Sequence, residues 1–491
     1  MQQTEAARAG NALMWRGTQL ALTKAIYVAR LLILARLLLP DDFGLLAIAL
    51  VIVGIFTTIS DLGIASALIQ GANADDRRFS VGWSLELTRA VCIAAALAIA
   101  APWMAAIFHE PRATNLIRAL ALTPIIEALA SVQIARLTRD LQFKTLATIK
   151  VPAAAVDILV AVSLAKTLGV WALVAGVIAG QLWVAVAANL LVPGRLILAF
   201  DRAVAGSILN FGRWVFLTGV LSMTASAILQ AAVARSLGTA DLGIYYMAAK
   251  IVALPAEVAG EVVGSVSFPL YARLNSNLRQ VEQAFRAIVA GTLAAVVPLY
   301  ALLLGLSASV AANVLGPQWH GIAPVINVLV VVGILSLLSD LTAPLLSGMG
   351  QPYKVTALEL AQSCLIVVCA QPLISQYGVV GAAAALLPAF IVSQGLCLVF
   401  LRQQFAHPLA GMTASTAVIC ATSAAGAFAA HAVVWFWPGM FGLVLGALTG
   451  LMLVAWLLWV LDQRLGLHMI EHFRRAFPKI SGILPRTIDR S

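Results

Sequence analysis

The sequence contains few charged residues. Asp, Glu, Lys and Arg make up only 11% of the 491 residues, whereas 62% are hydrophobic and the mean hydropathy is +0.97. A soluble protein of this length needs many more charged and polar side chains to cover its exterior. Runs of 18 or more mainly apolar residues are instead typical of transmembrane helices. The composition therefore predicts an integral membrane protein.

Signals for disulfides, metals, cofactors and enzymes are also scarce. The five cysteines lie inside apolar runs, and there is no CxxC pair or His/Cys cluster, which argues against a disulfide scaffold and a metal site. The motifs GxSxG and HExxH and the phosphate-binding loop are absent, so we expect neither an enzyme nor a cofactor. The net charge of +10 comes from basic residues scattered between the apolar runs, so a nucleic-acid partner is not expected either.

The apolar runs predict an all-α polytopic membrane protein with about fourteen transmembrane helices. The runs are longer than the 9–11 residues of a barrel strand and show no alternation of polar and apolar residues. The expected spans are 17–39, 43–69, 81–108, 113–135, 150–168, 170–192, 210–234, 243–270, 286–314, 322–348, 354–376, 378–401, 410–434 and 438–461.

A repeated joint organises the chain. The first two runs are joined by ARLLLPDDFGLL, residues 35–46, and the related joint ARSLGTADLGIY, residues 234–245, follows 199 residues later in the same register. This spacing is too long for a solenoid repeat and is typical of two duplicated halves of a transporter. The identical pairs include Arg36/Arg235, Asp42/Asp241, Gly44/Gly243, Asn11/Asn210 and Trp15/Trp214.

The repeat predicts two pseudo-repeated six-helix bundles followed by two additional helices. We expect an N-terminal bundle over 1–200, a second bundle over 201–401, two further transmembrane helices over 402–461, and a basic cytoplasmic tail over 462–491.

The distribution of Lys and Arg predicts the orientation. With a cytoplasmic N-terminus, 22 of the 31 basic residues fall on the cytoplasmic side, five fall on the far side and four lie within spans. This asymmetry follows the positive-inside rule and predicts that both termini are cytoplasmic. Residues 271–286 and 470–480 each place apolar side chains opposite basic ones, and we expect 271–286 to be a linker helix lying on the membrane surface.

Two charges lie where a membrane span normally has none. Lys24 and Arg30 are roughly 10 and 20 Å into the first span at about 1.5 Å per residue, with Tyr27 between them. A charge at that depth is costly and normally faces a polar interior. We interpret these residues as a cationic lining for an anionic substrate. The alternative is structural, with each cation paired to an acidic residue on a neighbouring helix.

The span 243–270 carries charges of both signs on one face. Lys250, Glu257 and Glu261 share this face, and Lys250 is a further candidate for substrate binding. Glu257 and Glu261 are candidates for gating or ion coupling, with Glu257 able to form either a breakable latch to Lys24 or Arg30 or a static ion pair. Asp61 in TISDLG is another substrate-binding candidate, whose alternative role is to cap a helix break.

The remaining acidic residues within spans allow less specific interpretations. Glu86 and Arg89 are three residues apart and are expected to pair with each other. Four single acids are each candidates for binding a coupling proton or sodium ion: Glu127, Asp157, Asp340 and Glu359.

Several motifs resemble a known transporter family. ARLLLPDDFGLLAIA, TISDLGIASALIQ, the charged DDRR loop, RLTRDLQFK at 136–144 and LLSGMGQPYK at 345–354 resemble the polysaccharide-transport branch of the MOP exporter superfamily, the Wzx/WzxC-like lipid-linked oligosaccharide flippases. The resemblance implies a V of two bundles and cations facing a cavity, at the places of Lys24, Arg30 and Lys250. The span 210–234 departs from the pattern, because Met223 and Leu229 replace the basic residues.

The resemblance implies translocation of an undecaprenyl-diphosphate-linked oligosaccharide, or a related polysaccharide precursor, across the bacterial inner membrane by alternating access. The expected partners are the lipid-linked glycan, the lipid bilayer and polysaccharide polymerase or assembly machinery. Two alternatives remain at this point. A MATE-like small-molecule exporter would need an acidic cavity, and an O-antigen polymerase or ligase would need a large far-side loop.

Overall fold

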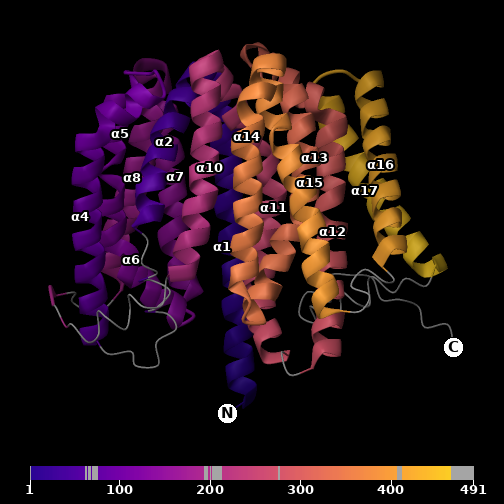
Figure 1. The fold of residues 1–491 in the computed structure, drawn as a ribbon, viewed down its shortest axis with the longest axis horizontal. Coiled ribbons are helices and arrows are strands. Elements are labelled where there is room, and N and C mark those ends of the chain that lie inside the picture. The colour runs from indigo at the N-terminus through magenta and orange to yellow at the C-terminus, as the bar shows by residue number, and fades with distance from the viewer. Residues whose placement is uncertain are drawn as a thin grey trace. The chain divides into compact units, whose positions relative to one another are not determined.

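The chain is helical throughout the part that its structure, a computed structural model, describes. The described residues are 2–60, 64, 68, 76–192, 197–199, 201, 213–274, 277–405 and 412–465, and they contain no strand (Figure 1). The α-helices are α1 (Gln2–Leu37), α2 (Pro40–Ile59), α4 (Asp76–Ile107), α5 (Ala113–Leu120), α6 (Thr123–Arg139), α7 (Phe143–Leu168), α8 (Val170–Leu191), α10 (Arg213–Leu237), α11 (Thr239–Leu274), α12 (Leu278–Ser309), α13 (Ile322–Gly348), α14 (Pro352–Ala384), α15 (Leu386–Gln404), α16 (Met412–Phe436) and α17 (Met440–Leu465). A π-helical turn, Val310–Leu315, and a 3-10 turn, Pro317–Trp319, connect α12 to α13.

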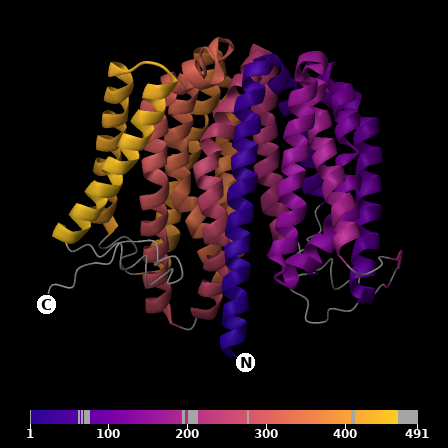
Figure 2. The ribbon, with the colours of Figure 1, turned by 180° about the vertical axis from the view of Figure 1, so that it is seen from behind.

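The helices confirm the all-α polytopic fold. Thirteen helical stretches of the described chain are long and apolar enough to cross a membrane, and they overlap the expected spans from 43–69 onward. Helix α1 covers residues 17–37 of the first expected span, 17–39, and Figure 2 shows it as one continuous helix. The chain is therefore a multi-pass membrane protein.

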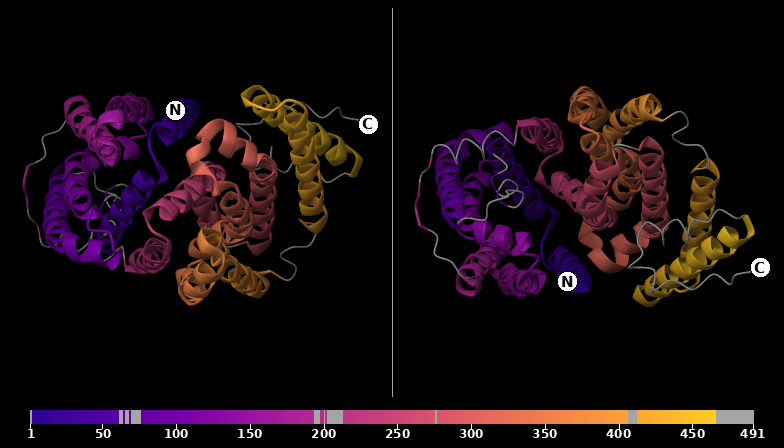
Figure 3. Two further views of the ribbon diagram at one scale, coloured as in Figure 1. Left: turned by 90° about the horizontal axis from the view of Figure 1, so that it is seen from above. Right: turned by 90° about the horizontal axis from the view of Figure 1, so that it is seen from below.

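Packing divides the chain into two compact units. Unit 1 is Met1–Gly243 and unit 2 is Ile244–Ser491. In unit 1, α7 packs on α1 and α8, α4 packs on α6, and α10 packs on α2; in unit 2, α12 packs on α13 and α16, and α14 packs on α15. Most helices of each unit are seen nearly end-on in Figure 3, whereas α16 and α17 are tilted relative to the other helices of unit 2.

Unit 1 includes α10, which the repeat assigns to the second bundle, 201–401. The boundary between the packed units, after Gly243, therefore differs from the boundary of the repeat, after residue 200. The reason is that α10 packs against α2 of unit 1. The bundles over 1–200 and 201–401 are inferred from the similarity between the two halves of the chain, and this division stays a prediction.

Helix ends coincide with local signals in the sequence. Pro40 begins α2, where a missing backbone donor costs nothing, and the carboxylate of Asp42 accepts a hydrogen bond from Leu39 N at 3.1 Å. Gly378 has φ 57° and ψ −139°, which interrupts α14 where the expected spans 354–376 and 378–401 meet. A side chain with a Cβ rarely adopts this conformation, so the glycine allows the break.

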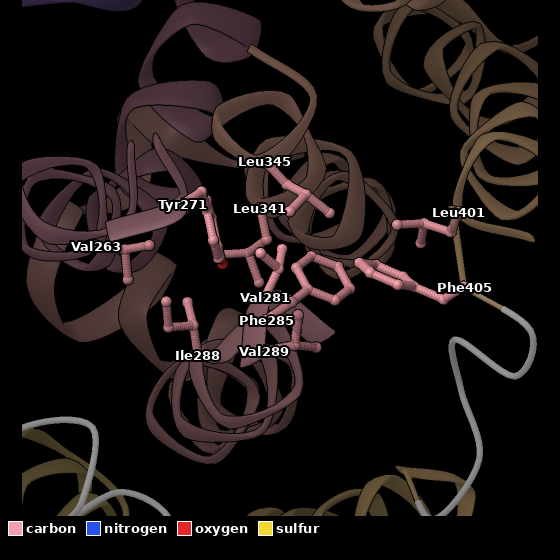
Figure 4. Packing of buried hydrophobic residues seen from close by; sticks show 10 residues of the cluster. All are labelled: Val263, Tyr271, Val281, Phe285, Ile288, Val289, Leu341, Leu345, Leu401 and Phe405. Carbon is pink, nitrogen blue, oxygen red and sulfur yellow. The ribbon is translucent and has the colours of Figure 1, made fainter. Parts of the chain in front are cut away.

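The prediction that 271–286 lies on the membrane surface was wrong. Helix α11 ends and α12 begins within this stretch, and its apolar face is the core of one end of unit 2. Tyr271, Val281 and Phe285 are each 0% exposed, and the Phe285 ring stacks on Phe405 of the segment after α15 (Figure 4). Neighbouring helices therefore cover the face that the sequence assigns to lipid. The expected tail helix over 470–480 lies outside the described residues.

Candidate functional site

Two of the three cations predicted for substrate binding, Lys24 and Arg30, lie on α1. Lys24, Tyr27 and Arg30 are all half-buried, within two turns of one another. Helix α1 packs along α7, so the side chains on this part of α1 have α7 as a neighbour.

Arg30 forms an ion pair with Asp157 of α7. Arg30 Nε lies 2.9 Å from Asp157 Oδ1, and the two side chains are only 12% and 22% exposed. Arg30 also donates a hydrogen bond of 3.4 Å to the carbonyl oxygen of Leu173 in α8. Arg30 thus connects α1, α7 and α8. Its pairing with Asp157 is the contact expected if Arg30 has a structural role, in which it pairs with an acidic residue on a neighbouring helix.

Small residues on α8 make room for the acidic partner. A Cβ at Gly176 would overlap Asp157 Oδ1, and a Cβ at Gly180 would lie 3.0 Å from the Cβ of Asp157. Glycines at this spacing allow two membrane helices to approach closely. The close approach of α7 and α8 holds the carboxylate in position for Arg30.

The other predicted charges lie on α11. Lys250 is half-buried with its Nζ 5.6 Å from the centre of the Tyr246 ring, whereas Glu257 and Glu261 are exposed. These three residues belong to unit 2, so the proposed latch from Lys24 or Arg30 to Glu257 stays a prediction. Asp61 lies outside the described residues.

The start of α11 and the start of α2 pack against each other inside unit 1. A Cβ at Gly44 would overlap the carbonyl oxygen of Thr239, and a Cβ at Gly243 would overlap the carbonyl oxygen of Pro40. Pro40 and Thr239 are 199 residues apart, as are Gly44 and Gly243. Each half of the repeat therefore makes the same contact with the other, as in the self-complementary interface of a symmetric dimer.

A polar network surrounds this glycine contact. The Thr239 hydroxyl donates to Asp41, and Arg112 Nη1 lies 2.9 Å from Asp41 Oδ2. Arg112 Nε also lies 2.7 Å from Glu110 Oε1. These hydrogen bonds, first to Glu110 and then to Asp41, raise the pKa of the Arg112 guanidinium above its ordinary value. The network secures the start of α11 to the start of α2.

Sequence reasoning missed this network, although the repeat pointed to its centre. The joint was recognised from its register, and Asp41 lies within it. Arg112 and Glu110 are in a short loop with no motif, so nothing in the sequence indicated that they would reach the joint. By contrast, Glu86 and Arg89 make the contact that their spacing predicts, and Arg89 Nη1 also donates to Ser60 Oγ at 3.1 Å.

Comparison with known families decides the affiliation of the chain. The model of the family described as "Polysaccharide biosynthesis protein" matches residues 33–324, more than half of the chain. The chain belongs to this family. The match includes Asp41, Gly44, Asp157 and Gly243, that is, both joints and the partner of Arg30. This match confirms the resemblance to polysaccharide biosynthesis and transport proteins.

Three curated proteins give the same affiliation. The lipopolysaccharide biosynthesis protein WzxC of Escherichia coli (strain K12) is 24% identical over 327 residues, covering 65% of this chain and 66% of its own length. The succinoglycan biosynthesis transport protein ExoT of Rhizobium meliloti (strain 1021) is 27% identical over 329 residues, covering 65% of each chain. The teichuronic acid biosynthesis protein TuaB of Bacillus subtilis (strain 168) is 24% identical over 304 residues, covering 59% of this chain and 61% of its own. The chain thus spans about two thirds of the length of the relatives it matches.

Solved structures share the fold. The lipid II flippase MurJ in an inward closed conformation superposes with a TM-score of 0.69 over 92% of this chain and 99% of its own, at 13% identity. An inward-facing multidrug resistance MATE family transporter of the MOP superfamily gives 0.63 over 79% of this chain and 95% of its own, at 15% identity. At these identities the likeness establishes the fold alone.

Proposed function

We propose that the protein is a flippase that moves a lipid-linked oligosaccharide, or a related polysaccharide precursor carried on undecaprenyl diphosphate, across the bacterial inner membrane. Both termini are then cytoplasmic, and the polysaccharide polymerase or assembly machinery receives the product. The observation that carries the proposal is the cationic pair within α1, Lys24 and Arg30, in a chain of a polysaccharide biosynthesis family.

The physical reason is the charge of the substrate. A diphosphate headgroup cannot enter hydrocarbon without a counterion, because burying an unpaired anion costs far too much free energy. A lining of Lys24, Arg30 and Lys250 replaces water around the headgroup, while the polyprenyl tail stays in the lipid. Alternating access then exposes this lining to one side of the membrane after the other.

The ion pair with Asp157 adds a step to this proposal. Arg30 and Asp157 neutralise each other across 2.9 Å. A diphosphate that enters the lining competes with the carboxylate for Arg30, so substrate binding exchanges one anion for another. In either pairing, Arg30 has an anionic partner, which avoids the cost of an unpaired buried cation. Glu257 and Glu261 are proposed to act in gating or ion coupling from α11.

Two other functions are consistent with parts of this description. The fold is also that of multidrug transporters, but cations in α1 do not suit a cationic drug. An enzyme that acts on the same lipid carrier would need catalytic residues that no motif supplies. A strain carrying the protein distinguishes the alternatives, because a drug exporter lowers drug susceptibility and a flippase restores surface glycan.

The test is export of surface glycan by a strain that lacks the native gene. Lys24→Ala combined with Arg30→Ala is expected to abolish export. Because Arg30→Ala also leaves Asp157 without its cation, size-exclusion chromatography of the detergent extract checks that the folded protein remains in the membrane. Lys166→Ala, which removes a cation from the last turn of α7, is the matched control and is expected to export normally. Normal export by the double variant would show that Lys24 and Arg30 do not bind the substrate.

The ion pair permits a sharper version. Arg30→Met combined with Asp157→Leu removes both charges and leaves no unpaired ion, so it is expected to fold stably but export poorly. If this double variant exported at the normal rate, Arg30 would be a purely structural residue.

A further inference from the structure

The motif RLTRDLQFK, residues 136–144, has no part in the proposed transport step. It forms the last turn of α6, a three-residue connection and the first two residues of α7. Its cations contact aromatic rings of other helices: Arg136 lies 4.5 Å from the centre of the Phe79 ring in α4 and Arg139 lies 6.0 Å from it. The motif therefore gathers cations and rings at one end of unit 1.

The start of α7 makes a crossed pair of such contacts with α1. The guanidinium carbon of Arg16, in α1, is 5.8 Å from the centre of the Phe143 ring in α7. In the opposite direction, Lys144 Nζ of α7 is 5.7 Å from the centre of the Trp15 ring in α1. Both distances are within the roughly 6 Å at which a ring face attracts a cation. Each helix thus holds a positive charge of the other against one of its rings at the α1–α7 seam.

In the part of the chain that the structure describes, Arg16 and Lys144 have no carboxylate counterion, unlike Arg136 and Arg77. Arg136 lies 2.7 Å from Asp76, and Arg77 lies 2.9 Å from Asp201. Among the side chains that the structure describes, no carboxylate lies within 4.0 Å of the cationic nitrogens of Arg16 or Lys144. Arg16 instead donates to Gln19 at 2.8 Å. An aromatic ring attracts a cation without neutralising it, so this seam retains positive charge.

The backbone at the same place adds to the positive potential. Gln142 precedes α7, and its side chain makes no capping hydrogen bond. The first N–H groups of a helix carry partial positive charge and favour an anion. Leu141 has φ 55°, a left-handed conformation that L side chains rarely adopt, and it makes the turn that brings the start of α7 beside α1.

The surroundings identify the kind of anion. Met14 and Leu141 are next to these residues in the chain and are 66% and 53% exposed. Phe143 is the first residue of α7, and Trp15 lies in α1 two residues before the first expected span, 17–39; aromatic residues at the end of a span favour the headgroup layer. The site lies about 12 Å along α1 from Lys24, at roughly 1.5 Å per residue, so it is separate from the proposed substrate lining. We propose that Arg16 and Lys144, positioned by the rings of Phe143 and Trp15, bind the phosphate of an anionic membrane phospholipid.

The experiment measures phosphatidylglycerol binding by the full-length protein. The protein is placed in nanodiscs of phosphatidylcholine, with and without phosphatidylglycerol, and bound lipid is counted by native mass spectrometry. Each surface cation contributes roughly fivefold to the affinity for an anionic lipid, so Arg16→Gln with Lys144→Gln is expected to weaken binding roughly thirtyfold. Arg16→Lys with Lys144→Arg keeps both charges and is expected to keep most of the affinity.

The control is Lys166→Gln, which removes a cation from the other end of α7 and is expected to leave binding unchanged. Equal losses in the control and the double variant, or no loss in either, would overturn the proposal. Unchanged thermal midpoints in phosphatidylcholine show that the variants fold. Should the double variant fail this check, Lys144→Gln alone, at an exposed position, is expected to weaken binding about fivefold.

A second arm uses nanodiscs of phosphatidylcholine with undecaprenyl diphosphate. If this lipid, and not phosphatidylglycerol, bound in a way that depends on Arg16 and Lys144, the site would belong to the transported carrier and the phospholipid assignment would be wrong. Export of glycan is a separate readout, so failure of the phospholipid site would leave the proposed function standing.

Discussion

Unit 1 and unit 2 connect their helices by different polar interactions. In unit 1 the pair Arg30–Asp157 joins α1 to α7 by charge. In unit 2, Gln362 donates to Ser393 at 2.7 Å and Gln394 donates to Ser339 at 3.0 Å, and Lys354 of α14 donates to the neutral Gln403 of α15 at 2.9 Å. These bonds join α13, α14 and α15 without an ion pair. An amide that loses its partner inside a membrane protein often finds another, whereas a charge does not. Unit 1 is therefore the region in which a single substitution has the larger consequence.

Within unit 1, the repeat-related helices α1 and α10 also differ, because α1 carries charges where α10 carries apolar side chains. The position of Arg30 in α1 corresponds to Leu229 in α10, a core residue that is 2% exposed. The position of Lys24 corresponds to Met223, whose methyl group would lie 2.9 Å from a Cβ at Gly54 of α2. The duplication preserved the joint but replaced the cations by apolar side chains that pack. The glycine contact at the joint involves both halves of the repeat, whereas the cations occur only in α1.

Removing one partner of the ion pair is the largest expected effect. Asp157→Ala leaves the guanidinium of Arg30 buried without a carboxylate and is expected to destabilise the protein by about 3–5 kcal/mol. Thermal unfolding of the detergent-solubilised protein measures this loss. Arg30→Met with Asp157→Leu should recover most of the stability, and a loss as large as that of the single variant would show that the pair itself is not the cause.

Filling the glycine contact is expected to have the next largest effect. Gly44→Ala adds a Cβ that overlaps the Thr239 carbonyl, so the starts of α2 and α11 must separate, which costs about 1–3 kcal/mol. Gly260→Ala is the matched control, because a Cβ at Gly260 meets nothing within 4 Å. Comparable unfolding midpoints for the two variants would contradict close packing at the joint.

A neutral hydrogen bond in unit 2 should matter less. Gln362→Leu removes the donor to Ser393, whose hydroxyl keeps Ser339 as a neighbour at 3.2 Å. Hydrogen bonds between membrane helices contribute about 0.6 kcal/mol on average, so a small decrease in the unfolding midpoint is expected. A decrease equal to that of Asp157→Ala would remove the contrast between the units.

The smallest effect is expected at the edge of the joint. Arg112 is 56% exposed, and its pairs with Asp41 and Glu110 are in contact with water. Arg112→Gln is expected to cost less than about 1 kcal/mol, and the difference from wild type should shrink as salt is raised. Unfolding midpoints at low and high ionic strength measure it, and a large loss that is insensitive to salt would show that the network is effectively buried.

Three features of this protein can be predicted without a structure: the membrane spans, the break at Gly378 and the register of the repeat. A bilayer requires apolar runs of a minimum length, and a helix satisfies its own backbone hydrogen bonds, so these features can be inferred locally. The cations of α1 were also evident, because a charge inside an apolar run is conspicuous whatever surrounds it.

The contacts of those features depend on how the helices pack. Asp157 as the partner of Arg30, Arg112 at the joint and the crossed contacts between α1 and α7 all join residues far apart in the chain. Residues 271–286 show the same limit, because their periodicity reveals one apolar face but not whether lipid or α13 covers it. Inside a membrane both coverings are apolar, so composition cannot distinguish them and packing makes the choice.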